Sequence, residues 1–213
     1  MRKKTKILVS LPLIVLVLLS GIWISMSIFF KVETVEYDIL EKQGRIEIRQ
    51  YPSYLVAETV VDADFKEAGN RAFGRLFNYI SGHNRKQESI AMTVPVTQTE
   101  TSEKIPMTVP VSMQETEGLY AVSFLMPAKY TMDTIPEPLD ENVVIREVPA
   151  QKVAAIRYSG TWTQERYETR KATLESFMET KGLMPVGEPV FARYNPPIQI
   201  WFLRRNEVLI PVE

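Results

Sequence analysis

The sequence predicts an α+β domain built from two similar halves, preceded by a membrane-spanning helix. Three observations indicate this: an uncharged apolar run near the N-terminus, a strand–strand–helix pattern that recurs at an offset of about 97 residues, and an excess of expected strands over helices. In a chain of 213 residues we expect a cytoplasmic N-terminus and anchor in residues 1–32. A single domain then occupies residues 33–213, with halves at about 35–126 and 140–213.

The uncharged run from Ile7 to Phe30 predicts the membrane anchor. As a helix it reaches about 36 Å, enough to cross a hydrocarbon core of roughly 30 Å. Its N-terminal flank carries Arg2, Lys3, Lys4 and Lys6, so the positive-inside rule places the N-terminus in the cytoplasm and the domain outside it, in the periplasm of a Gram-negative cell. The alternative is a signal peptide cleaved near Ser20–Gly21, but the run is longer and its end bulkier than such a signal needs.

Composition excludes several classes of site. The chain has no cysteine, which excludes disulfides, thiolate metal sites, a cysteine nucleophile and c-type haem attachment. The net charge is −1, and residues 1–30 carry four cations and no acid, which leaves −5 for the rest. A mildly acidic domain lacks the basic surface that nucleic-acid binding requires.

The duplication sets the order of the predicted elements. Arg45–Pro52 and Asn142–Pro149 are alternating strands that end at a proline, and Tyr54–Val61 and Lys152–Tyr158 follow as second strands. A helix follows in each half, so the fold is an antiparallel, curved sheet with one helix per repeat.

The first helix is expected from Asp64, whose side chain caps it with Glu67 in a capping box, to Ser81. Its apolar stripe is Ala68, Ala72, Phe73, Leu76, Phe77 and Ile80. The second helix is expected from Thr163 to Lys181, before Gly182. Its stripe is Tyr167, Leu174, Phe177 and Met178.

The remaining strands are expected at 120–126, 190–194, 199–203 and 207–210, with a proline-containing linker at 127–141. The pentapeptide Met-Thr-Val-Pro-Val occurs twice, at Met92–Val96 and Met107–Val111. Each copy predicts a short edge strand, because proline tolerates a position without a ladder donor. The polar segment between them is expected to form a hairpin loop.

Three sets of motifs carry a family resemblance. The tandem pentapeptides follow Phe77–Asn84, the opening contains Tyr37–Leu40 and Ile46–Tyr51, and the C-terminal part contains Tyr194-Asn-Pro-Pro and Arg204-Arg-Asn-Glu-Val. In this order, from about residue 35 to 212, they resemble the SOUL haem-binding protein family. The resemblance implies a distorted β-barrel with two helices, similar to gyrase-inhibitor-like ligand-binding domains, and a protein that binds, buffers or transfers haem or a porphyrin without catalysis. The membrane anchor is predicted from residues 7–30 and not from the resemblance.

By the same resemblance, the first helix and its flanking loop contact the tetrapyrrole. We therefore expect Arg71 and Arg75 to pair with propionates and Phe73 and Phe77 to supply an apolar wall. His83, the only histidine, is expected to bind the haem iron because imidazole is a standard iron ligand, and not because of the resemblance. The alternative is structural: a stripe that faces the sheet, a solvated arginine face and a solvated histidine in the loop. Other ligand atoms lie on Met92, Met107 and Met113, and on Tyr51, Tyr54, Tyr79, Tyr158 and Tyr194.

Two other functions stay open. A binding module for another amphipathic or aromatic ligand would use a groove lined by Trp201, Phe202 and Tyr194. A hydrolase would use a buried carboxylate beside aromatic residues, for which the candidates are Glu58, Glu147 and Glu188. Neither a nucleophile elbow nor metal-ligand spacing is present, and we expect a binding protein rather than an enzyme.

Overall fold

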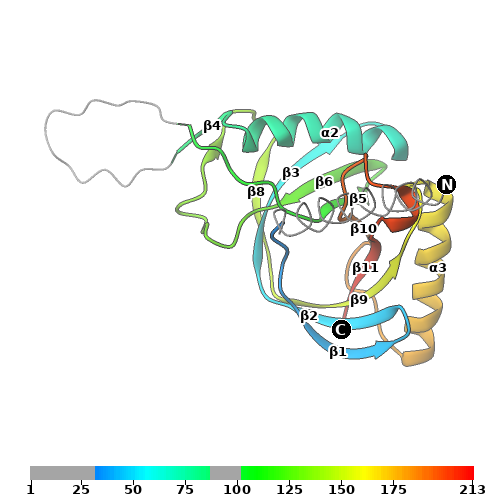
Figure 1. The fold of residues 1–213 in the computed structure, drawn as a ribbon. Helices are drawn as coiled ribbons and strands as arrows, with labels where there is room; N and C mark the ends of the chain where they lie inside the picture. The colour runs from blue at the N-terminus through cyan, green and yellow to red at the C-terminus, as the bar shows by residue number, and fades with distance from the viewer. Residues whose placement is uncertain (1–31, 87–101) are drawn as a thin grey trace, which may run out of the picture. The chain divides into compact units, whose positions relative to one another are not determined.

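The computed structural model describes residues 32–86 and 102–213, and the chain from Glu33 to Glu213 forms one compact unit (Figure 1). The core cluster lies wholly between Ile48 and Val212, so this unit holds a core of its own. The main sheet contains β1 (Asp38–Gln43), β2 (Ile46–Tyr51), β3 (Tyr54–Val61), β5 (Val111–Thr116), β6 (Leu119–Leu125), β8 (Val144–Val148), β9 (Gln151–Tyr158), β10 (Val190–Arg193) and β11 (Asn206–Val212). The other elements are α2 (Phe65–Ile80), α3 (Gln164–Lys181), the short strands β4 (Asn84–Arg85) and β7 (Glu137–Pro138), and the 3-10 helix η1 (Trp201–Leu203).

Among the described residues, the sheet has nine strands in the order β1-β2-β9-β11-β10-β5-β6-β3-β8, and every pairing is antiparallel. Matching β2 with β8, β3 with β9, β5 with β10 and β6 with β11 makes the order read the same from either end, apart from the extra β1. The expected two halves therefore meet at the β5–β10 pair. They also exchange strands, because β2 pairs with β9 of the second half and β8 with β3 of the first.

Side-chain alternation divides the sheet into two faces. Ala57 of β3, Val122 and Phe124 of β6 and Ile156 of β9 are buried under the helices. Their neighbours along the strands point the other way, because successive side chains of a strand alternate between faces. Helix α2 contacts β3 and β6, and α3 contacts β9 and β11, so both helices cover one face of the curved sheet (Figure 1).

Both helices begin and end as the sequence predicts. The side chain of Asp64 accepts a hydrogen bond from the backbone N–H of Glu67 at 2.8 Å. Gly182 adopts the left-handed conformation after Lys181, where an L side chain would be strained. The Thr163 side chain, however, makes no capping hydrogen bond.

Four expectations about the fold are wrong or only partly right. Residues 201–203 form η1 rather than a strand. The copy Met107–Val111 is irregular up to Pro110, and β5 starts at Val111. The linker contributes buried Ile135 to the core. The sheet is open, with β1 and β8 as edges, so the implied barrel does not close.

Other expectations fall on residues that the structure does not describe. The copy Met92–Val96 and the anchor from Ile7 to Phe30 lie outside the described residues. Within residues 32–86 and 102–213, no helix has both the length and the apolar composition of a membrane span.

A buried ion pair links the two halves through the exchanged strand. Arg49 of β2 donates two hydrogen bonds to the carboxylate of Glu207 on β11, at 2.7 and 3.1 Å, and both side chains are almost fully buried. Arg205 and the Tyr194 hydroxyl also donate to this carboxylate. Burial alone would raise the pKa of Glu207, but Arg49 and then Arg205 lower it overall.

The equivalent arginine of the other half makes a far more exposed pair. Arg146 lies about 97 residues after Arg49 and pairs with Glu58 at 2.6 Å, while 45% of the arginine side chain and 22% of the carboxylate side chain are accessible. The two pairs therefore allow the effect of burial on the stability of an arginine–glutamate pair to be compared within one domain.

We predict that Glu207→Gln lowers the free energy of unfolding of fragment 33–213 by about 3 kcal/mol, because Arg49 would keep its burial and lose its buried counter-charge. Of the described residues, only Glu47, 2.8 Å away and partly accessible, would still pair with Arg49. Glu58→Gln is the control and should cost less than about 1 kcal/mol. Urea unfolding at pH 7 measures both. Equal losses for the two variants would contradict the assigned difference.

The same carboxylate has a pH signature. Because its folded-state pKa lies below its ordinary value of 4.5, its contribution is complete above that pH and is lost as the pH falls through the folded-state pKa. Urea midpoints between pH 7 and pH 3 should therefore fall less steeply in Glu207→Gln than in the unmodified fragment.

Candidate functional site

Arg193 is a partly buried cation without a carboxylate partner among the described residues. It ends β10 on the face that carries the helices, and its Nε has no hydrogen-bond partner within the described part of the chain. Burial lowers the pKa of Arg193 to about 10, and the group that opposes this is Tyr158. The Tyr158 hydroxyl is itself buried and makes no hydrogen bond there. Two adjoining polar groups are therefore left unsatisfied, which is costly without a further partner.

Three more arginines lie near these groups. The Arg170 guanidinium lies 5.9 Å from the Tyr158 ring centroid, and Arg166 also acts to lower the pKa of Tyr158, against the larger effect of burial. Arg204 stacks on Trp162 at 4.3 Å, and Arg193 lies 5.2 Å from the same ring. None of the four arginines forms an ion pair with an acid of the described residues. This region is therefore cationic.

Exposed apolar side chains border the arginines. The Gly160 N–H donates to the carbonyl of Trp201 at 3.1 Å, which places η1 beside the start of α3. Trp201 and Phe202 are 53% and 55% exposed, with ring centroids 5.4 Å apart. The apolar neighbours Ile198, Ile200 and Leu203 are exposed as well. Grouped apolar exposure of this kind marks an interaction site in soluble domains.

Helix α2 supplies the opposite border. An added Cβ on Gly69 would clash with the guanidinium group of Arg193, so the two segments are in contact. One turn further, Phe73 and Phe77 are stacked with ring centroids 5.7 Å apart and are 37% and 45% exposed. We call the region that runs from these rings past Arg193 and Trp162 to Arg204 and η1 the helix-side surface. It combines exposed aromatic rings with guanidinium groups that have no acidic partner among the described residues, and it suits a flat apolar ligand that carries carboxylates. Arg204 is held in place by hydrogen bonds to the carbonyls of Gln199 and Pro197, at 2.9 and 2.7 Å.

The sequence-predicted site residues separate onto two flanks of α2. At 100° per residue, Arg71 and Arg75 project roughly 200° away from Phe73 and Phe77. Arg71 pairs with Glu67 at 2.7 Å, and Arg75 donates to the Val60 carbonyl at 3.5 Å.

His83 lies on the same side as Arg75. Hydrogen bonds from Asn142 lower the pKa of Asp140, and the charges of Arg75 and His83 contribute to the same shift, which places both near that carboxylate. The histidine is exposed in the turn after α2. The structure therefore brings Phe73 and Phe77 together but not with the predicted arginines or histidine.

The other predicted ligand atoms are dispersed. Met92 lies outside the described residues, Met107 is 43% exposed and Met113 is buried in the core. Tyr79 donates to the Pro136 carbonyl in the core. Within residues 32–86 and 102–213, no group of three histidine or acidic side chains is arranged to hold a metal ion.

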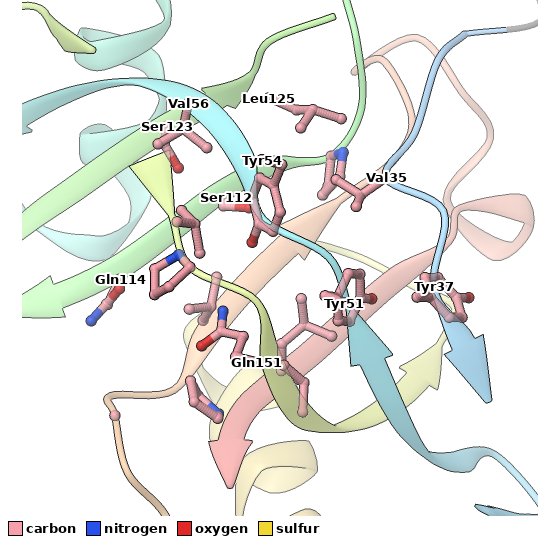
Figure 2. A pocket seen from close by; sticks show the side chains of 18 of the residues that line it. Val35, Tyr37, Tyr51, Tyr54, Val56, Ser112, Gln114, Ser123, Leu125 and Gln151 are labelled. Carbon is pink, nitrogen blue, oxygen red and sulfur yellow. The ribbon is translucent and has the colours of Figure 1, made fainter. Parts of the chain in front are cut away.

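A second concave region lies on the sheet face away from the helices. This cleft has a volume of about 1000 Å³ and is lined by Tyr51 and Tyr54, with Val56, Ser123 and Gln151 nearby (Figure 2). Of the predicted carboxylates, Glu58 and Glu188 line the cleft, and Glu147 is exposed on β8.

The predicted ligand groove is also divided. Tyr194 lines the cleft, whereas Trp201 and Phe202 belong to the helix-side surface and are not part of the cleft lining. The three residues therefore do not form one pocket.

Comparison with known proteins gives a consistent relationship. A family model described as "SOUL heme-binding protein" matches residues 32–103 and 97–211. The human protein named Heme-binding protein 2 is 28% identical over 174 residues, which cover 77% of this chain and 80% of that protein. Heme-binding protein 1 of Xenopus tropicalis is 25% identical over 192 residues, covering 84% of this chain and 96% of that protein.

Solved structures share the fold at low sequence identity. The C-terminal domain of EcmrR superposes with a TM-score of 0.52 at 13% identity, covering 83% of this chain and 98% of that domain. A hydrolase from Listeria innocua has a TM-score of 0.51 at 11% identity, and the match covers 82% of this chain and 94% of that chain. These likenesses show the architecture alone.

The contact between Gly69 and Arg193 predicts opposite responses to the same substitution within α2. Gly74→Ala should raise the free energy of unfolding by about 0.5 to 1 kcal/mol, because alanine favours the helix and nothing lies within 4 Å of the new methyl group. Gly69→Ala should give no gain or a loss, because the methyl group displaces the Arg193 guanidinium. Urea unfolding of the two variants measures the difference, and an equal gain in both would show that Arg193 does not occupy this position.

Proposed function

The chain belongs to the SOUL haem-binding protein family, and we propose that its domain binds haem or a related tetrapyrrole non-covalently on the helix-side surface. Binding, buffering or transfer of the tetrapyrrole, rather than catalysis, is the proposed role. Family membership and relatives named as heme-binding proteins support haem as the ligand. The single structural observation that supports the location is Arg193, a partly buried cation whose buried Nε lacks a partner among the described residues.

The chemistry of this surface fits the ligand. Haem is a flat apolar macrocycle with two carboxylates on one edge, so it needs a broad apolar surface and cations at one side of it. The rings of Phe73 and Phe77 offer apolar area, and Arg193 and Arg204 lie beside Trp162 where carboxylates would find guanidinium donors. When bound, haem supplies its iron chemistry, whereas the protein residues hold the ring and its propionates.

The position of Trp162 is fixed independently of any ligand. Its indole N–H donates to the Asn206 side chain at 2.7 Å, and Asn206 donates in turn to the Gly160 carbonyl at 3.2 Å. Asn206 is fully buried. The ring on which Arg193 and Arg204 rest is therefore held rigidly, which reduces the ordering cost of binding.

We further propose that residues 7–30 anchor the domain to a membrane, with the N-terminus in the cytoplasm and the domain outside it. The support is the sequence itself: a run without charged residues, preceded by four cations. An extracytoplasmic, membrane-bound domain would meet haem or porphyrin beside the bilayer.

Haem titration of fragment 33–213, followed at the Soret band, tests the proposed function. We expect saturable binding at micromolar haem and about tenfold weaker binding in Arg193→Gln, because a charge-assisted hydrogen bond to a carboxylate is lost. Arg71→Gln is the matched control, since Arg71 lies on the opposite flank and is paired with Glu67. The absence of a saturable Soret change would contradict the proposed haem binding.

His83→Ala in the same titration separates the two flanks of α2. We expect the Soret spectrum and affinity to stay unchanged, because His83 lies with Asp140 and not with the Phe73 and Phe77 rings. Binding that is lost in His83→Ala but kept in Arg193→Gln would move the site to the other flank.

Fractionation of cells tests the anchor. The full chain should remain in the membrane fraction after a high-salt, alkaline wash, whereas fragment 33–213 expressed alone should be released. Protease added outside intact spheroplasts should digest the domain of the full chain. A protected domain would contradict the proposed orientation.

A further inference from the structure

The cleft on the sheet face away from the helices takes no part in the proposed haem binding, yet it is large and open to ligands. Its volume of about 1000 Å³ is at the upper end of the range for small-molecule sites. The floor is made of short or uncharged side chains, including Ser112, Ser123, Ala121 and Gln114 (Figure 2). Such a floor leaves room for a flat molecule. The charges at its edge, Glu58 beside Ser123 and Arg146, pair with each other at 2.6 Å.

Tyrosines form one wall. The ring centroids of Tyr37 and Tyr51 are 4.9 Å apart, and those of Tyr51 and Tyr54 are 6.4 Å apart, so three rings make a continuous row (Figure 2). Tyr194 contributes a fourth ring to the lining. Burial raises the pKa of Tyr51 and of Tyr54, so both remain neutral phenols. The Tyr51 hydroxyl accepts a hydrogen bond from Arg49 at 3.0 Å, which holds the buried ring behind the more accessible Tyr54.

Every arginine of the cleft lining is already paired. Arg146 is bound to Glu58 at 2.6 Å, and Arg205 to Glu207 at 2.9 Å. The acids Glu36, Asp38 and Glu188 also line the cleft, are exposed, and form no ion pair among the described residues. The lining therefore has a negative balance and no uncommitted cation.

This charge balance decides between classes of ligand. A molecule with carboxylates, such as haem, would bring negative charge toward three acids and find no unpaired guanidinium. A positively charged aromatic molecule would gain from the same acids and from the electron-rich face of Tyr54. The rings of Tyr37 and Tyr194 already carry the guanidinium groups of Arg49 and Arg205, at 4.3 and 3.9 Å. A cleft lined by one sign of charge also concentrates ligands of the opposite sign.

The geometry points to the cleft as a second binding site, for a flat organic cation that lies along the Tyr37–Tyr51–Tyr54 row. Its opening faces away from the helix-side surface, with the sheet between them. The domain therefore has a cationic site for an anionic ligand on one face and an acidic, aromatic site on the other. Both can be occupied at once, because no residue of the helix-side surface lines the cleft.

Fluorescence anisotropy with two xanthene dyes tests the assignment on fragment 33–213. Rhodamine 6G is a cation and fluorescein an anion with the same ring system, so their comparison isolates charge. We expect saturable binding of rhodamine 6G, at least about tenfold weaker binding of fluorescein, and a cation affinity that falls with added salt.

Two sets of variants locate the dye in the cleft. The triple variant Glu36→Gln, Asp38→Asn, Glu188→Gln changes exposed side chains only and should weaken rhodamine binding about tenfold. Tyr54→Leu should weaken it about fivefold, whereas Tyr54→Phe keeps the ring and should retain binding. Phe77→Ala, on the helix-side surface, should leave rhodamine binding unchanged.

The haem titration provides the remaining control, since the triple variant should keep the wild-type Soret response. Equal affinity for the two dyes would overturn the assignment. So would rhodamine binding that survives both the triple variant and Tyr54→Leu, or competition between haem and rhodamine for one site.

Discussion

Strict side-chain alternation along the central strands is the constraint on which the two surfaces depend. Phe191 and Arg193 of β10 lie on the helix side, while Val190 lines the cleft. A one-residue shift in register would exchange the two sets. The antiparallel pairing of β10 with both β5 and β11 holds this register, so the strands that define the pseudo-twofold centre also separate the two surfaces.

The two halves share a backbone arrangement but differ in the charge and burial of equivalent side chains. Arg49 and Arg146 occupy equivalent positions, yet one is buried against Glu207 and the other lies at the more exposed end of the cleft. The helices differ in the same way, because α2 exposes aromatic rings beside the arginines, whereas α3 contributes Arg166 and Arg170 to them. A duplicated scaffold thus presents one composite surface made from unlike halves.

The sequence predicted the scaffold well because its signals are local. Alternation, the Asp64 cap and Gly182 each depend on a few neighbouring residues, and they located both helices and most strands. The strand predicted at 199–203 is wrong, because apolar residues that favour β-structure do not form a strand without a partner strand. The helix stripe misplaced Phe73 and Phe77, because periodicity gives the apolar face but not how far a curved sheet extends beneath it.

The candidate site was harder to predict, because it is assembled from residues distant in the chain. Arg193 comes from β10, Trp162 from the segment before α3 and Gly69 from α2, and only the fold brings them together. One feature of the sequence could have indicated Arg193. It lies two residues after Phe191, which faces the core, so the alternation of a strand puts its charged side chain on the same, core-facing side.

The position of the Arg193 charge connects the stability of the domain with the proposed ligand binding. Burial lowers the pKa of Arg193 to about 10, so the guanidinium remains charged at neutral pH at a cost on the order of 3 kcal/mol to the ligand-free domain. A carboxylate that pairs with Arg193 offsets part of this cost only in the folded protein, because the surrounding rings and Gly69 are assembled only there. If the proposed ligand pairs with Arg193, ligand binding and unfolding are thermodynamically linked through this one side chain, and stabilisation grows with ligand concentration. The cleft has no equivalent, because its arginines are already paired within the fold.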